Sequence, residues 1–270
     1  AAAIDFTRTT PPDDGAIILT ITGDEEALGE DGTRALLDWM AGQGEAMNHC
    51  IVGEPTCIES FGDMMKIGRR GSLTLHVEAR GVQGHSAYPH RARNPVHALI
   101  SLLAGLTAQP LDAGTEHFEP STLQVVSVDV GNPASNVIPA TARAVINIRF
   151  NDAHDGAGLV DAITQQADRI AASSGVALQI TPRISGESFL TAPGRFVDLV
   201  HEAVQEVTGV EPVLSTSGGT SDARFIKDHC PVVEFGLVGR YMHQIDERVP
   251  EAEIIALKAA YAAILKRYFA

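Results

Sequence analysis

The chain has 270 residues, of which 44% are hydrophobic, and its formal net charge is −14 at pH 7. This charge excludes a nucleic-acid surface or an anionic membrane as the main partner, because the summed field repels both. No apolar stretch is long enough to span a membrane and the first residues lack the layout of a signal peptide, so the sequence predicts a cytoplasmic protein. Its three cysteines are too few and too irregularly spaced for a disulfide framework or a cysteine-rich zinc site.

The first part of the chain has the pattern of an α/β domain. Residues 15–22, "GAIILTIT", form a short apolar run that predicts a strand buried on both faces of a parallel sheet. A helix is expected from residue 33 to Gly42 or Gly44, followed by a second buried strand in residues 49–56. Ligands bind at the carboxyl ends of strands in open α/β sheets. Both predicted strands lead into carboxylates there: Glu25, Glu26 and Glu54.

The pattern changes at residue 71. Leu73, Leu75, Val77 and Ala79 alternate with polar residues, which predicts a strand with one wet face. A helix follows, with Asn94 as its cap and Pro95 at its first position. The remaining elements give a β-α-β-β-α-β order, which matches the ferredoxin-like motif. They are strands at about 122–130 and 141–150, a helix at about 156–173 and a strand at about 176–183.

The α/β pattern then resumes to the end of the chain. It predicts a helix over 195–207, a strand in "PVVEFG" at 231–236 and a closing amphipathic helix from about 251 to 268. The simplest organisation is a catalytic-type α/β domain formed by residues 1–70 and 186–270. An inserted domain, residues 71–185, interrupts it.

Three adjacent acids, Asp24, Glu25 and Glu26, need an explanation because like charges at short distance disfavour one another's ionisation. One explanation is an ordinary solvated helix start, where acids favour the helix dipole. The other is a metal site, in which Glu54 and the loop histidine His243 join them as oxygen and imidazole ligands of zinc. A divalent cation would turn the mutual repulsion into attraction.

Eight motifs occur in an order that resembles one known family, and the resemblance runs from about residue 16 to the end of the chain. They are "GDEEALGEDGT", "IVGEPT", "GRRGSL", "GVQGHSAYPH", "NPASNVIPA", "SGESFLT", "STSGGTSDARFI" and "MHQIDERV". The sequence resembles the succinyl-diaminopimelate desuccinylases, which belong to the superfamily of dinuclear zinc deacylases, aminoacylases and exopeptidases. The resemblance implies an α/β fold with a zinc-exopeptidase-like mixed sheet flanked by helices. It also implies that the inserted domain is an α+β ferredoxin-like dimerisation domain.

The resemblance further implies a reaction and a set of roles. The family hydrolyses the amide of N-succinyl-LL-2,6-diaminopimelate to succinate and LL-2,6-diaminopimelate, with two Zn²⁺ ions per subunit and Co²⁺ as a substitute. Glu25 would be the general base, Glu26 and His243 would bind one zinc and Glu54 the other. In the expected homodimer, His85 would reach the partner's active site and stabilise the tetrahedral oxyanion. The implied substrate-binding residues are Arg69, Arg70, Ser72, Asn136, Arg149, Ser185, Gly219 and Thr220.

Taken alone, several of these residues have a plainer interpretation. His85 could be a surface loop histidine, Arg149 a charge at the rim of an apolar strand, and the Gly-Gly-Thr-Ser turn common loop material. Two other functions also stay open. One is a sister deacylase such as an N-acetylornithine deacetylase, because acyl-group choice depends on pocket shape. The other is a non-catalytic dimerisation or binding module, whose dimer interface would use the wet-faced sheet's edge strand or the first helix.

One part of the family pattern is missing from this sequence. The family requires a His-x-Asp motif and a separate metal-bridging Asp upstream of the first acids, yet none of the ten histidines is followed two residues later by Asp. "GDMMK", at residues 62–66, resembles the bridging motif but stands at the wrong place in the order. The first residue is not Met, and "AAAIDF" reads like the middle of a helix, so we expect an upstream segment. Without one, the chain would bind metal weakly or not at all and be inactive, because zinc sites normally have three or four protein ligands.

Overall fold

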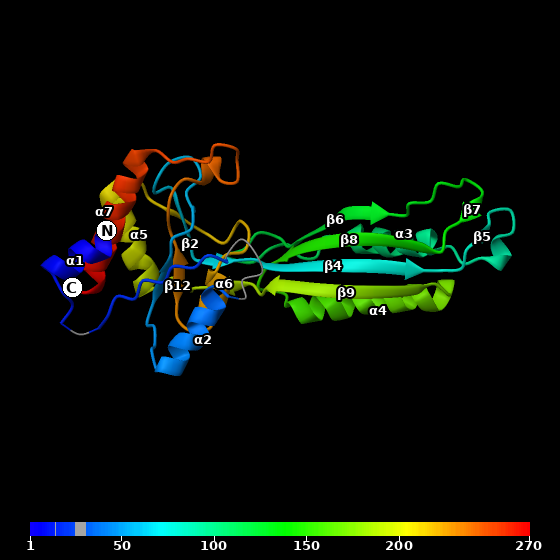
Figure 1. Ribbon diagram of the computed structural model, residues 1–270, viewed down its shortest axis with the longest axis horizontal. Coiled ribbons are helices and arrows are strands. Elements are labelled where there is room, and N and C mark those ends of the chain that lie inside the picture. Colours follow the sequence, from blue (N-terminus) through cyan, green and yellow to red (C-terminus); the bar gives the residue numbers. More distant parts are fainter. Residues whose placement is uncertain (14, 25–30) are drawn as a thin grey trace. The chain divides into compact units, whose positions relative to one another are not determined.

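The computed structural model describes residues 1–13, 15–24 and 31–270, and its contacts divide the chain into two compact units. Unit 1 comprises Ala1–Arg69 and Phe189–Ala270, and unit 2 comprises Arg70–Ser188. Unit 2 is therefore one continuous segment of chain between the two parts of unit 1 (Figure 1). Across the described ranges, no helix is both long and apolar enough to cross a membrane.

Unit 1 is built on a mixed four-stranded sheet, as the family resemblance implied. Its strand order is β1-β12-β2-β11, in which the outer pairs β1/β12 and β2/β11 are parallel and the central pair β12/β2 is antiparallel. The strands are β1 (Cys50–Val52), β2 (Met64–Lys66), β11 (Val213–Ser215) and β12 (Val232–Glu234). A two-stranded antiparallel ribbon joins β3 (Gly68–Arg69) to β10 (Phe189–Leu190).

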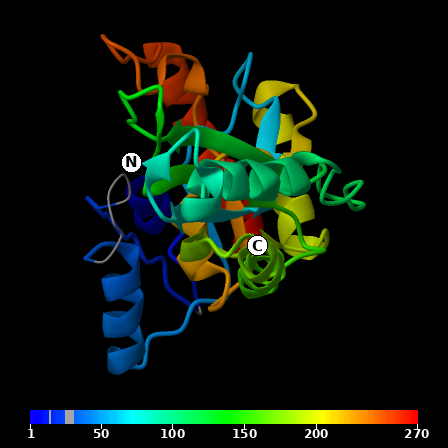
Figure 2. The same ribbon diagram turned by 90° about the vertical axis from the view of Figure 1, so that its right-hand side faces the viewer.

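Two long helices, α5 (Arg195–Thr208) and α7 (Glu251–Tyr268), bury the main core of unit 1 with the sheet. Val200 and Ala260 are fully buried in this cluster together with Phe235, which follows β12. A second cluster joins α2 (Thr33–Gln43), blue in Figure 2, to the short helix α6 (Ala223–Ile226). Among its described residues, unit 1 also contains the helices α1 (Ala2–Thr9) and η2 (Gly239–Tyr241).

The strand predicted for residues 15–22 is wrong. These residues adopt no regular secondary structure, and Leu19 and Ile21 are 77% and 84% exposed. A run of β-formers becomes a buried strand only where neighbouring strands bind its backbone and other side chains cover it. None of the described residues pairs with this run, so the apolar pattern alone is not sufficient.

Unit 2 has the ferredoxin-like arrangement predicted from the β-α-β-β-α-β order. All pairs in its sheet are antiparallel, in the order β6-β8-β4-β9, and α3 and α4 pack with the sheet around one core (Figure 1). The alternation predicted from residue 71 is confirmed, because Leu73 and Leu75 are fully buried and Val77 is 2% exposed. The elements are β4 (Gly71–Arg80), α3 (Pro95–Thr107), β6 (Thr122–Asp129), β8 (Thr141–Phe150), α4 (Gly156–Ser174) and β9 (Ala177–Gly186).

Local sequence explains how the helices of unit 2 start. The side chain of Asn94 accepts a hydrogen bond from the Val96 backbone at 3.0 Å, and Pro95 supplies the fixed φ of a first helical residue. Asp155 caps α4 in the same way through Gly158 at 2.7 Å. A small ribbon, β5 (Gly84–His85) with β7 (Val137–Ile138), and the 3-10 turn η1 (Pro89–Arg91) complete the unit.

Candidate active site

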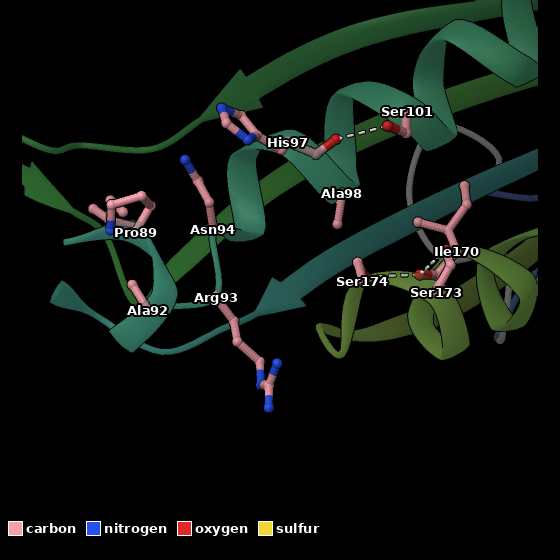
Figure 3. Close-up of a pocket in the computed structure, with 11 residues that line it drawn as sticks. Pro89, Ala92, Arg93, Asn94, His97, Ala98, Ser101, Ile170, Ser173 and Ser174 are labelled. Atoms are coloured by element: carbon pink, nitrogen blue, oxygen red, sulfur yellow. Dashed lines mark hydrogen bonds between the residues drawn. The ribbon is translucent and has the colours of Figure 1, made fainter. Parts of the chain in front are cut away.

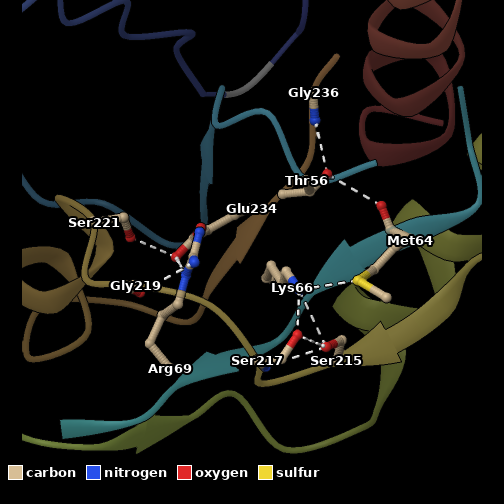
Figure 4. Close-up of polar contacts among 10 residues, drawn as sticks. All are labelled: Thr56, Met64, Lys66, Arg69, Ser215, Ser217, Gly219, Ser221, Glu234 and Gly236. Atoms are coloured by element: carbon tan, nitrogen blue, oxygen red, sulfur yellow. Dashed lines mark hydrogen bonds and ion pairs between the residues drawn. The ribbon is translucent and has the colours of Figure 1, made fainter. Parts of the chain in front are cut away.

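A buried ion pair between Arg69 and Glu234 is the centre of the polar cluster in unit 1 (Figure 4). The Arg69 Nε donates to both carboxylate oxygens of Glu234 at 3.0 Å, and its Nη2 donates to Oε2. Ser221 donates its hydroxyl to Glu234 Oε1 at 2.6 Å, and Arg69 Nη1 donates to the Gly219 carbonyl at 3.1 Å. Glu234 is 1% exposed, so its charge depends on these partners. The pair therefore fixes the "SGGTSD" loop against the end of β12.

Lys66 carries a second buried charge in the same sheet. It is the Cα partner of Glu234 between β2 and β12, and it is 6% exposed. Its Nζ donates to the hydroxyls of Ser217 at 2.8 Å and Ser215 at 3.2 Å (Figure 4). Neither Lys66 nor Glu234 is among the predicted site residues. The available signal was one charged residue inside each apolar run, "MMKIG" and "PVVEFG".

Glu54 lies where the chain leaves β1, at the same edge of the sheet as Glu234. The parallel register of β1 and β12 pairs Val52 with Glu234, and Glu54 is half-buried two residues further on. A Cβ at position 236 would collide with the Glu54 carbonyl oxygen, so Gly236 permits this close approach. Thr56 reinforces it, accepting from the Gly236 N–H at 3.2 Å. The edge expected to bind ligands thus carries Glu54.

The predicted metal ligands are only partly within the described residues. Glu25 and Glu26 lie outside them. His243 is exposed in a loop after η2 with a φ of 59°, a conformation that non-glycine residues adopt rarely. Residues 1–13, 15–24 and 31–270 contain no group of three or more His, Cys, Asp or Glu side chains that could hold a metal ion. The described residues therefore do not complete a metal site by themselves, and the ligand roles of Glu54 and His243 stay predictions.

Arg70 and Arg149 form a cationic pair at one end of the unit 2 sheet. Arg149 on β8 is the Cα partner of Ser72 on β4. Arg70 immediately precedes β4, which begins at Gly71. Burial lowers the pKa of the Arg149 guanidinium, and the nearby charge of Arg70 lowers it further. The Nε of Arg70 is buried without a hydrogen-bond partner among the described residues. Two half-buried guanidiniums near one another favour an anionic ligand, and the geometry of a carboxylate matches them.

Ser72 and Ser185 lie at the same end of this sheet. Ser72 is 4% exposed and also pairs with Gly186 on β9. The β4/β9 register shifts between Ser72 and Leu73, so Ser185 is an extra residue that no β4 residue faces. The structure therefore brings together four of the predicted substrate-binding positions: Arg70, Ser72, Arg149 and Ser185.

His85 and Asn136 lie beyond the opposite end of β4. His85 pairs with Val137 on the β5–β7 ribbon, and the Asn136 carbonyl accepts from the Ser86 N–H at 2.9 Å. Ten residues of β4 separate this ribbon from the cationic pair, a length of about 30 Å. Within unit 2, His85 therefore does not share a site with Arg149. In unit 1, Thr220 is half-buried and Gly219 is exposed in the loop held by Arg69.

A surface pocket of about 390 Å³ in unit 2 is lined by residues of η1, α3 and α4 (Figure 3). Several of its polar side chains form hydrogen bonds within the helices. Asn94 caps α3, and Ser101 donates to the His97 carbonyl at 2.9 Å. Ser174 likewise donates to the Ile170 carbonyl at 2.7 Å. These side chains do not indicate a catalytic role for the pocket. Two separate candidate elements remain: in unit 1 the sheet edge that carries Glu54, and in unit 2 the cationic pair of Arg70 and Arg149.

Comparisons with solved structures agree with this fold. The chain is similar to the aminopeptidase PepT from Bacillus cereus, with a TM-score of 0.72, 18% identity and coverage of 88% of this chain and 62% of that one. It is also similar to the dipeptidase Dug1p from Saccharomyces cerevisiae, with a TM-score of 0.63, 16% identity and coverage of 92% and 64%. The chain thus spans less than two thirds of either structure, and at these identities the likeness concerns the fold alone.

Comparisons of sequence give the family. Residues 67–174 match the peptidase dimerisation domain. A succinyl-diaminopimelate desuccinylase of Paracoccus denitrificans is 66% identical over 270 residues, which is 100% of this chain and 71% of the relative. The proteins of the same name from Cereibacter sphaeroides and Ruegeria pomeroyi are 63% and 62% identical with the same coverage. The chain belongs to the succinyl-diaminopimelate desuccinylase family.

Proposed function

We propose that the protein hydrolyses the amide bond of N-succinyl-LL-2,6-diaminopimelate, giving succinate and LL-2,6-diaminopimelate. The observation that carries this proposal is the 66% identity over the whole chain to a relative named for that reaction. The product would serve diaminopimelate and lysine biosynthesis, and we place the protein in the cytoplasm.

The cationic pair gives the proposal its substrate-binding element. The substrate is an anion with several carboxylates, and an acidic protein needs local cations to bind it. Arg70 and Arg149 supply two guanidiniums, neither of which forms an ion pair with the described residues. A substrate carboxylate would satisfy the buried Nε of Arg70 and relieve the repulsion between the two charges. Ser72 and Ser185 stand beside them as hydroxyl donors.

Arg69 receives a different role from the one expected. Its guanidinium already binds Glu234 and the Gly219 carbonyl, and the residue is 9% exposed. A direct substrate contact would have to compete with this buried ion pair. We therefore assign Arg69 to holding the loop with Gly219 and Thr220, which are the proposed substrate contacts.

The reaction we propose depends on a divalent metal, zinc or in its place cobalt, with two ions per subunit. Glu26, Glu54 and His243 are the proposed ligands, and such ions would polarise the amide carbonyl and lower the pKa of bound water. Glu25, as a carboxylate, would accept a proton from the attacking water and return it to the departing amine.

We also propose a homodimer, in which His85 and Asn136 act in the second subunit. The peptidase dimerisation domain matches 108 residues, 67–174, most of unit 2. The separation of about 30 Å between His85 and the cationic pair along β4 supports action between subunits, because one substrate cannot span it within unit 2. Light scattering at micromolar concentration tests the dimer, and a monomer would argue against this role of His85.

The activity is tested by comparing turnover of N-succinyl-LL-2,6-diaminopimelate with that of N-acetylornithine by the purified protein loaded with zinc. We expect a clear preference for the succinylated substrate. Equal or inverted rates would favour a sister deacylase. Absence of turnover, together with absence of tight zinc binding by titration, would favour a non-catalytic module.

A further inference from the structure

The backbone around His85 pairs with β7 in the small ribbon of unit 2. Gly84 pairs with Ile138 and His85 pairs with Val137 in antiparallel register. The Ser86 N–H continues the ladder to the Asn136 carbonyl at 2.9 Å. The Tyr88 N–H then closes a turn onto the His85 carbonyl, also at 2.9 Å. The main chain that carries the imidazole is therefore fixed.

The imidazole ring itself receives one backbone hydrogen bond. The Ala87 N–H donates to His85 Nδ1 at 3.1 Å, and the Tyr88 ring packs beside the imidazole with 5.7 Å between centroids. A ring nitrogen that accepts a hydrogen bond from an N–H carries no proton. In the neutral ring the proton is then on Nε2. The residue is exposed, so an incoming group can approach the imidazole.

We propose that the Ala87 N–H selects the tautomer of His85, making the histidine a hydrogen-bond donor through Nε2 and withholding Nδ1 from proton abstraction. This inference rests on the proposed function, in which His85 stabilises the oxyanion of a substrate in the second subunit. A preorganised donor does this because it needs no reorganisation when the charge develops. Ala87 is thus a positioning residue that acts through His85.

The tautomer is read directly by nitrogen NMR of the labelled full chain at a pH where the imidazole is neutral. We expect the Nδ1 resonance of His85 to be that of an unprotonated nitrogen and the Nε2 resonance to be that of a protonated one. Ala87→Gly keeps the backbone N–H and should leave both unchanged, whereas Ala87→Pro removes it and should give a mixture. A protonated Nδ1 in the unmodified protein overturns the proposal, whether or not Ala87→Pro folds.

Two isosteric variants test the consequence for turnover. Gln at position 85 places an amide NH₂ near the position of Nε2, whereas Asn places its amide near Nδ1. We expect His85→Asn to lower kcat for N-succinyl-LL-2,6-diaminopimelate by about 100-fold. His85→Gln should retain a clearly higher kcat than His85→Asn. KM should change little in either variant. If both variants turn over like the unmodified protein while the NMR result holds, the tautomer stands and the oxyanion role of the proposed function fails.

Discussion

Thr33 and Asp222 are joined by a 2.6 Å hydrogen bond although 189 positions separate them in the sequence. Both residues are buried, at 9% and 5% exposure. Thr33 begins α2 and Asp222 precedes α6, so the bond connects the starts of two helices that share a small core. Thr22 donates to the same carboxylate oxygen at 3.3 Å. The other oxygen has no hydrogen-bond partner among the described residues. Thr33 therefore makes the shorter of the two side-chain hydrogen bonds that stabilise this buried carboxylate.

Removing the Thr33 hydroxyl should therefore destabilise unit 1. Thr33→Val keeps the shape of the side chain but leaves the buried Asp222 carboxylate without its shortest hydrogen bond. We expect the free energy of unfolding to fall by about 1–3 kcal/mol, as measured by urea denaturation. Thr33→Ser is the matched control because it keeps the hydroxyl. Equal stability of the Val and Ser variants would show that the bond contributes nothing.

The buried pair of Arg69 and Glu234 should tolerate joint replacement better than loss of one partner. Arg69→Met leaves the carboxylate of Glu234 buried at 1% exposure without its ion-pair partner, although Ser221 still donates to it. Breaking a buried ion pair in this way costs about 3–5 kcal/mol. The double variant Arg69→Met, Glu234→Gln should recover part of that loss, because it removes both charges. A double-mutant cycle in guanidinium chloride measures the coupling, and strict additivity of the two single effects would contradict a direct interaction.

The sequence was sufficient to predict the four long strands and the two long helices of unit 2, but not its small β5–β7 ribbon. Strict alternation at Leu73, Leu75 and Val77 marks one buried face, and Asn94 followed by Pro95 marks a helix start, so each local signal agrees with the final fold. Residues 15–22 show the opposite case. Their apolar run has the composition of a strand, but strand formation depends on neighbours, and composition carries no information about them.

The site was predicted less completely, for a related reason. Pattern reasoning treats a charged residue inside an apolar run as an interruption, so Lys66 and Glu234 were missed although the structure pairs them across β2 and β12. Arg69 was recognised as a cation, but its partner is 165 positions away and no spacing rule connects them. Arg70 falls within the motif "GRRGSL", whereas Arg149 lies outside the eight motifs and was proposed because the family resemblance favours a substrate contact at the end of its strand.

A polar network around Asp112 makes the stability of unit 2 depend on pH. Burial opposes ionisation of Asp112, but hydrogen bonds from the Ser121 hydroxyl and from backbone N–H groups outweigh it and hold the pKa of this carboxyl well below its usual value of 3.8. Asn151, fully buried, donates to Asp112 Oδ1 at 2.7 Å, and His154 contacts Oδ2 at 3.0 Å. Because the folded pKa is depressed, the ionised carboxylate contributes stability above the unfolded pKa. This stability is lost as the pH falls below that value toward the folded pKa.

Replacing Asp112 should therefore lower the free energy of unfolding at neutral pH, and this effect should become smaller in acid. Asp112→Asn keeps one acceptor oxygen but removes the negative charge of the carboxylate to which Ser121 and Asn151 donate hydrogen bonds. We expect the difference in free energy of unfolding between the two proteins to be present at neutral pH and to shrink below about pH 4. Asp168→Asn, at an exposed position on α4, is the control and should show no such trend. A difference that does not change with pH would mean that the charge of Asp112 is unimportant.

Substrate anchoring by Arg149 can be separated from general charge effects with a second arginine on the same strand. Arg143 lies on β8 with its side chain 63% exposed and pairs with Glu78, whereas Arg149 is half-buried beside Arg70. A charge-assisted hydrogen bond to a substrate carboxylate contributes about 1.5–3 kcal/mol, so Arg149→Gln should lower kcat/KM by roughly 10- to 150-fold. Most of this loss should appear in KM, because the contact anchors the substrate in both the ground and transition states. Arg143→Gln removes the same formal charge and should change neither constant by more than about twofold. Steady-state kinetics with N-succinyl-LL-2,6-diaminopimelate measure both constants, and equal losses in the two variants would show that net charge, not a specific contact at Arg149, governs substrate binding.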